Sequence, residues 1–193
     1  MCKRILSACV SVQEGVPPAE FRFCHRINIL FGQNAEDVVL TLAGVFGGVP
    51  PQSFHAALNW RDDATLFVSG YDGRVFVDSI ENKQGDPAQL MKCFYKHRFL
   101  NFRKNAHLLD GSRLHAGTSG TGDLLLEKLN ATLAKEDDCP LFICNFLERL
   151  DEAIDLQPIW EALLATRRQI FIAVPHYYNT KQLEEMHYDI HIL

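Results

Sequence analysis

Residues Arg26–Val39 hold the part of the chain whose order suggests phosphate chemistry. They read Arg-Ile-Asn-Ile-Leu-Phe-Gly-Gln-Asn-Ala-Glu-Asp-Val-Val. The branched apolar run before Gly32 is typical of a buried strand, and a helical pattern of apolar residues follows it. A strand, a glycine turn and a helix form the frame of a phosphate-binding loop, whose backbone N–H groups surround the phosphate oxygens. The residues that would form the binding site are Gly32, Gln33, Asn34, Asp37, Val38 and Val39.

The side chains that perform the chemistry in such a loop are missing. A working loop ends in Gly-Lys-Ser/Thr, where the lysine neutralises phosphates and the hydroxyl binds Mg²⁺. Those positions are Asp37, Val38 and Val39 here, and a carboxylate would repel phosphate oxygens. Our hypothesis is a vacated phosphate site. Glu36 and Asp37 would then stabilise the start of the helix in place of the ligand's anion, and the two valines would pack into the sheet.

Two later segments end where they can contribute to the same site. Pro140–Cys144 and Gln169–Val174 are continuous apolar runs, as in buried parallel strands. Ligand sites in parallel α/β sheets lie beyond the carboxyl ends of the strands. We therefore expect Ile27–Phe31, Leu141–Cys144 and Ile170–Ala173 to be neighbouring parallel strands of one sheet. The residues expected near their ends are Asn145, Glu148 as a weak candidate base or a surface carboxylate, and His176 as a weak candidate or a structural histidine.

The remaining pattern predicts a single α/β domain over residues 1–193. Asp72-Gly73 between β-prone runs predicts a hairpin in an antiparallel β insertion at about 54–80. Asp86-Pro87 predicts the start of a helical segment at about 86–110. Further strands are predicted at 4–12, 20–23 and 188–193, and further helices at 36–46, 123–134, 155–165 and 180–186.

Two more segments have compositions that allow binding. Thr118-Ser119-Gly120 lies in a glycine-rich loop before a helix, which fits either an anion-binding loop or a simple capped turn. Residues 92–104 mix bases with aromatics, which fits either nucleic-acid contact or an amphipathic helix with solvated bases. The bases of this segment are Lys92, Lys96, Arg98, Arg103 and Lys104.

Composition narrows the class of protein. The formal net charge is −5, so the surface as a whole is not built to attract nucleic acid or anionic membrane. No apolar run is long enough to cross a bilayer, and no signal-peptide core follows the N-terminus. The six cysteines form no C-x-x-C pair, which favours reduced thiols over a zinc site. We expect a cytoplasmic protein with no membrane insertion and no bound metal.

The order of these pieces resembles a compact ABC-type ATPase head of the SMC and RecF-like P-loop NTPase superfamily. Arg26–Gly44 resembles the family's strand, phosphate loop and helix, usually I-N-x-L-x-G-x-N-G-x-G-K-S/T. Thr118–Gly120 resembles the signature motif, Pro140–Asn145 the Walker B strand, and Gln169–His176 the strand and switch loop that carry a histidine. The coiled-coil arm is absent. The resemblance implies a mostly parallel sheet with flanking helices and an antiparallel β region.

The departures from the family lie in its catalytic positions. Besides the altered phosphate loop, Asn145 stands where the Walker B aspartate is expected, and Phe146 where the catalytic glutamate is expected. Pro175 takes the place of the switch histidine, and His176 follows it. The resemblance therefore implies an ABC-ATPase-like protein with degenerate Walker motifs, a non-hydrolysing binding or regulatory module that needs no cofactor.

Two alternatives stay open. The first is an ATP-binding protein or ATPase, with Mg²⁺, whose atypical site is completed by a partner subunit. In the family the signature motif acts across a dimer, so Ser119 and Gly120 would serve a second copy or a competent heterodimer partner. The second alternative is a nucleic-acid-associated accessory protein of repair or defence. If the chain is an enzyme, the reaction implied is ATP hydrolysis.

Overall fold

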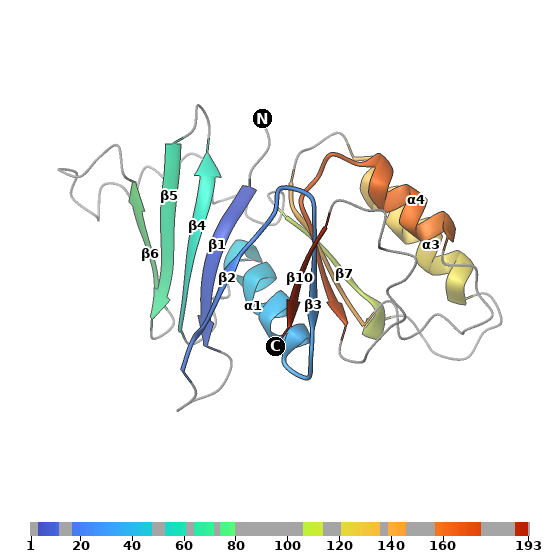
Figure 1. Ribbon diagram of the computed structural model, residues 1–193. Helices are drawn as coiled ribbons and strands as arrows, with labels where there is room; N and C mark the ends of the chain where they lie inside the picture. The colour runs from blue at the N-terminus through green and yellow to red at the C-terminus, as the bar shows by residue number, and fades with distance from the viewer. Residues whose placement is uncertain are drawn as a thin grey trace.

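The computed structural model describes residues 4–11, 17–47, 53–60, 64–71, 74–79, 106–113, 121–135, 139–145, 157–174 and 188–192. These residues form two five-stranded sheets and the helices packed against them. One sheet is antiparallel and the other is parallel (Figure 1).

The antiparallel sheet has the strand order β2-β1-β4-β5-β6. Tyr71 of β5 pairs with Arg74 of β6, which confirms the hairpin predicted at Asp72-Gly73. The antiparallel region predicted at about 54–80 is therefore present, but it is not a separate insertion, because β1 and β2 belong to the same sheet. The strands are β1 (Arg4–Ser11), β2 (Ala19–Arg22), β4 (Ser53–Trp60), β5 (Ala64–Tyr71) and β6 (Arg74–Ser79).

The parallel sheet has the strand order β10-β3-β9-β8-β7. The three apolar runs expected to be neighbours are β3, β9 and β8, and all of their pairings are parallel. That prediction is confirmed. The strands are β3 (Ile27–Phe31), β7 (His107–Asp110), β8 (Leu141–Cys144), β9 (Ile170–Val174) and β10 (Tyr188–Ile192).

Strand β7 corrects the sequence-based assignment of residues 86–110 to a helical segment. Its four residues pair in parallel with β8, so the sheet satisfies their backbone groups. A strand this short has too few residues for a periodic pattern, and its partner lies far along the chain. Residues 86–105 and the helix predicted at 180–186 lie outside the described ranges.

The described helices agree with three of the predicted ones within two residues at either end. Helix α1 begins directly after a short loop that follows β3, and the short helix η3 follows β7. Helices α3 and α4 precede β8 and β9. Their bounds are α1 (Ala35–Gly47), η3 (Gly111–Arg113), α3 (Thr121–Leu133) and α4 (Gln157–Ala165).

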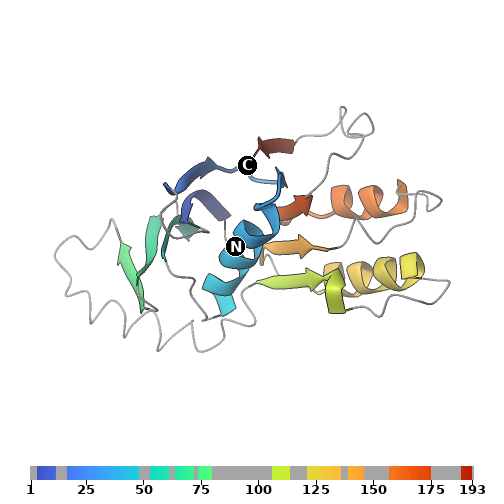
Figure 2. The ribbon, with the colours of Figure 1, turned by 90° about the horizontal axis from the view of Figure 1, so that it is seen from below.

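The elements stack as sheet, helix, sheet and helix pair. Helix α1 lies between the two sheets, and α3 and α4 cover the other face of the parallel sheet (Figures 1 and 2). Alternation along β9 explains the two faces, since Phe171 and Ala173 lie in the core with α1, whereas Ile170, Ile172 and Val174 pack with α3 and α4. Apolar side chains on both faces therefore fix the parallel sheet at the centre of the molecule.

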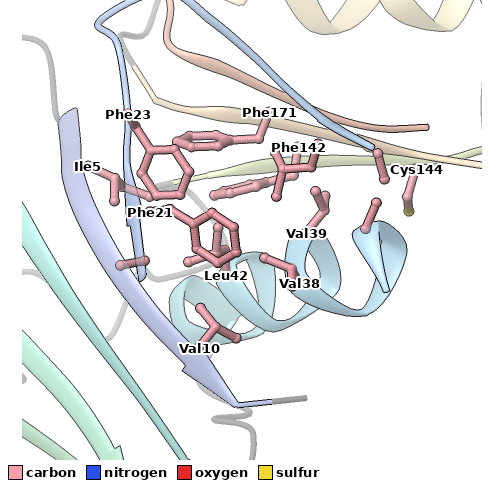
Figure 3. Packing of buried hydrophobic residues seen from close by; sticks show 14 residues of the cluster. Ile5, Val10, Phe21, Phe23, Val38, Val39, Leu42, Phe142, Cys144 and Phe171 are labelled. Carbon is pink, nitrogen blue, oxygen red and sulfur yellow. The ribbon is translucent and has the colours of Figure 1, made fainter. Parts of the chain in front are cut away.

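A row of four aromatic rings joins the two sheets within the apolar core that lies between them (Figure 3). Phe21 of β2 stacks on Phe23 with ring centroids 5.8 Å apart. Phe23 meets Phe171 edge to face at 4.9 Å, and Phe171 stacks on Phe142 at 5.0 Å. Each such pair contributes about 0.5–1.5 kcal/mol beyond the burial of its area.

Candidate functional site

The loop between β3 and α1 is shorter than a phosphate-binding loop. β3 ends at Phe31 and α1 begins at Ala35, which leaves Gly32, Gln33 and Asn34 between them. Gly32 has a φ of 126°, a conformation that glycine adopts most readily. Its N–H donates to the Val174 carbonyl at 3.2 Å, and its carbonyl accepts from the Ala35 N–H at 3.1 Å. The turn is therefore closed by its own backbone.

Helix α1 already includes the positions at which a phosphate-binding lysine and hydroxyl would stand. The Val38 N–H donates to the Asn34 carbonyl at 3.0 Å, so it is occupied by a helical hydrogen bond. A loop that surrounds phosphate needs successive N–H groups that point at the anion. The early start of α1 removes at least this N–H group from such a role.

Val38 and Val39 lie in the core between the sheets. They are 1% and 0% exposed and belong to one apolar cluster with Leu42, Phe142 and Phe171 (Figure 3). The expectation that both valines pack into the sheet is confirmed. Neither side chain is exposed to a ligand bound in the loop.

The side chain of Asn145 bridges two carboxylates at the carboxyl edge of the parallel sheet. Asn145 directly follows β8 and has a φ of 51°, which asparagine tolerates better than most residues. Its Nδ2 donates to Glu36 Oε1 at 2.5 Å and to Asp110 Oδ1 at 3.3 Å. Asp110 Oδ1 also accepts the Ser112 N–H at 2.9 Å. The bridge thus joins the start of α1 to the ends of β8 and β7.

This edge of the sheet is acidic. Glu36 and Asp37 occupy the first turn of α1, as predicted, and Asp110 ends β7. Carboxylates repel the phosphate groups of a nucleotide. The favourable interaction of Glu36 and Asp37 with the helix dipole, about 0.3–1 kcal/mol each, needs no ligand.

Asp110 is the site residue that sequence reasoning missed. It falls in the segment that was assigned to a helix, and only the pairing of β7 with β8 brings it next to Asn145. The local signal was an acidic residue after two leucines and before a glycine. Several predicted residues lie outside the described ranges: Glu148, His176, Ser119, Gly120, Lys92, Lys96, Arg98, Arg103 and Lys104.

Other expectations concern metal, thiols and membrane. Within the part of the chain that the structure describes, no three or more His, Cys, Asp or Glu side chains gather in a way that could hold a metal ion. Among the described residues, Cys9, Cys24, Cys139 and Cys144 are not in disulfide bonds. None of the helices among the described residues is both long and apolar enough to span a membrane.

Comparisons with known proteins gave matches among solved structures alone. No protein-family model matches the sequence, and no curated protein matches it. The chain is similar to the SMC head domain from Thermotoga maritima, with 10% identity and a TM-score of 0.49 over 90% of this chain and 89% of that one. It is also similar to the recombination mediator protein RecF bound to ATP, with 12% identity and a TM-score of 0.35 over 70% of this chain and 41% of that one.

Proposed function

We propose that this chain is an ABC-ATPase-like module that does not hydrolyse ATP and acts by binding or regulating a protein partner. The observation that carries the proposal is the bridge from Asn145 to Glu36 and Asp110. It occupies the edge of the sheet at which a nucleotide and its metal ion would have to bind.

The first argument is chemical. Catalysis of phosphoryl transfer consists almost entirely of positioning and of neutralising charge on the phosphates. At the candidate site the position of the lysine is Val38, which is buried, and the position of the Mg²⁺-binding hydroxyl is Val39, which is also buried. A substitution elsewhere would have to supply both a cation and its placement. The described part of the site contains acids and amides instead.

The second argument is energetic. A nucleotide with its metal ion would have to break the Asn145 bridge and open the Gly32–Asn34 turn. Each hydrogen-bonding group left without a partner in a buried place costs about 1–3 kcal/mol. The carboxylates of Glu36 and Asp37 would add repulsion to these costs. These costs oppose the binding of a nucleotide at this site.

The third argument concerns the partner. A module that does not hydrolyse ATP itself must act by binding another molecule. By the resemblance, Ser119 and Gly120 would face nucleotide held by another subunit, either a second copy or a competent ATPase. Contact with nucleic acid through residues 92–104 is the alternative role, and it makes the same prediction of an inactive site.

A hydrolysis assay on the purified chain tests the proposal. Phosphate release from Mg-ATP is measured for the unmodified chain and for Asn145→Ala and Glu148→Gln. We expect no release above background, and no difference between the three proteins. A turnover that either substitution abolishes would overturn the proposal, because it would give these residues a role in catalysis.

A further inference from the structure

Two fully buried amide side chains connect the antiparallel sheet to the parallel sheet. Gln169 and Asn28 are each 0% exposed. Gln169 directly precedes β9 and Asn28 lies in β3, so both belong to the parallel sheet or its edge. Their hydrogen bonds reach β1 and the segment 23–26 that crosses from β2 to β3.

Gln169 takes the place of a missing strand partner for Ile5. β2 pairs with β1 from Ser7 to Val10, so its pairing ends before Ile5. Gln169 Oε1 accepts the Ile5 N–H at 2.7 Å, and Gln169 Nε2 donates to the Ile5 carbonyl at 2.8 Å. One primary amide thus satisfies both backbone groups of Ile5, as a neighbouring strand would.

Cys24 is held by both amides. Gln169 Nε2 donates to the Cys24 carbonyl at 2.7 Å, and Asn28 Nδ2 donates to it at 3.2 Å. Asn28 Oδ1 accepts the Cys24 N–H at 2.9 Å, and Asn28 Nδ2 also lies 3.3 Å from the Ile170 carbonyl. The two side chains therefore share an acceptor and act on one point of the crossing segment.

The hydrogen bonds between Gln169 and Ile5 are buried, whereas those that reach Cys24 are partly buried. Phe23 precedes Cys24 and packs edge to face against Phe171. Phe23 and Ile5 are buried members of the core between the sheets. A backbone group of Ile5 that loses its partner here cannot turn to solvent, so each hydrogen bond lost at Ile5 carries the full cost of desolvation.

The crossing segment is also fixed on its far side. The Arg26 guanidinium donates through Nη2 to the carbonyl of Leu164 at 2.6 Å and to that of Thr166 at 3.0 Å. These carbonyls lie at the end of α4. The segment from Phe23 to Arg26 is thus held by β3, by the start of β9 and by α4.

We propose that Gln169 and Asn28 form an amide latch, a conformational device that sets the orientation of the antiparallel sheet against the parallel sheet. The latch lies at the amino ends of β3 and β9, whereas the candidate site lies at the carboxyl ends of β3, β7 and β8. The two sheets therefore keep one fixed arrangement without any ligand at the site. This inference does not depend on whether the site takes nucleotide.

Residual dipolar couplings of backbone N–H groups test the latch. Alignment tensors are fitted separately to β1 with β4 and to β3, β8 and β9, in the unmodified chain, in Gln169→Met and in Gln33→Met. Gln33 is exposed, so Gln33→Met makes the same chemical change away from the latch. We expect one common tensor in the unmodified chain and in Gln33→Met. In Gln169→Met the alignment tensor fitted to the antiparallel sheet should have a smaller magnitude than that of the parallel sheet, because motion of one sheet against the other averages its couplings.

A role in packing alone would lower the stability of Gln169→Met but leave both sheets with one tensor, and this result would overturn the proposal. Hydrogen exchange of the unmodified chain in low denaturant provides a second test, should that variant not fold. The Ile5 and Cys24 amides should exchange through one shared opening, with the same free energy and the same dependence on denaturant. Two different opening free energies would contradict a single latch.

Discussion

Asn145 holds two carboxylates near one point by donating a hydrogen bond to each of them. Its Nδ2 donates to Glu36 and to Asp110, and its φ of 51° turns the chain at the end of β8. An aspartate at this position would accept hydrogen bonds but could not donate any. Asparagine therefore suits the acidic neighbours at this position better than aspartate would.

Replacement of Asn145 by aspartate should lower the free energy of unfolding by about 1–3 kcal/mol, because a third carboxylate replaces the shared donor. Asn145→Gly is the matched control, since glycine keeps the positive φ and removes the amide. Urea denaturation should show a greater loss for aspartate than for glycine. An aspartate variant at least as stable as the glycine variant would contradict the bridge.

Because Val38 is buried, a lysine at this position would be costly. Val38→Lys should lower the free energy of unfolding by about 3–5 kcal/mol, because the ammonium group would enter the apolar core. Asp37→Lys places the same side chain one residue earlier at an exposed position, where we expect a loss of about 1 kcal/mol. Equal thermal stability of the two variants would mean that the side chain at position 38 can reach solvent.

At the scale of elements, the start of helix α1 decides what the site can bind. The Gly32–Asn34 turn is closed by hydrogen bonds to Val174 and Ala35, and the helix continues through Val38 and Val39, where a phosphate-binding loop would carry a lysine and a hydroxyl. Strands β3, β8 and β9 still bring their carboxyl ends together, as in a ligand-binding α/β sheet. The sheet edge is thus arranged like that of a ligand-binding α/β sheet, but the turn after β3 passes directly into a helix.

The pairing of β1 with β2 places Cys9 opposite Glu20. Burial and the carboxylate of Glu20 raise the pKa of the Cys9 thiol above its ordinary value of 9.0. The stability that this shift contributes is complete below pH 9.0 and is lost as the pH rises through the folded-state pKa.

Glu20→Gln removes the carboxylate and should lower the pKa of Cys9 part of the way back. Alkylation of Cys9 by iodoacetamide at mildly alkaline pH, followed by peptide mass spectrometry, should then be faster in the variant than in the unmodified chain. Cys24, whose Sγ lies 3.1 Å from the Ile27 carbonyl, is the internal control. An unchanged rate at Cys9 would remove Glu20 as a cause of the shift.

At the scale of the whole molecule, much of the parallel sheet could be predicted from the sequence. β8 and β9 are continuous apolar runs, β3 is apolar except for Asn28, and all three are buried on both faces; this pattern needs no knowledge of distant contacts. The hairpin of β5 and β6 could also be predicted from a local signal, because Asp72-Gly73 marks its turn.

The parts that could not be predicted depend on contacts between distant segments. β7 pairs with β8, whose residues lie 34 positions further along the chain. A strand of four residues is also too short to show a periodic pattern. The bridge at Asn145 and the amide latch each join three segments through side-chain hydrogen bonds. A polar residue within or beside an apolar strand was the only sequence sign of Asn28 and Gln169, and it does not say which backbone groups they bind.

The most direct test of the vacated site is calorimetry of nucleotide binding to the isolated chain, with ATP in the presence and absence of Mg²⁺. The account predicts no saturable heat that corresponds to a Kd below about 1 µM under either condition. The measurement is repeated with Asn145→Gly, which removes the bridge. Saturable Mg²⁺-dependent binding at sub-micromolar Kd that is weakened in Asn145→Gly would contradict the account, because Asn145 would then hold a ligand instead of closing its site.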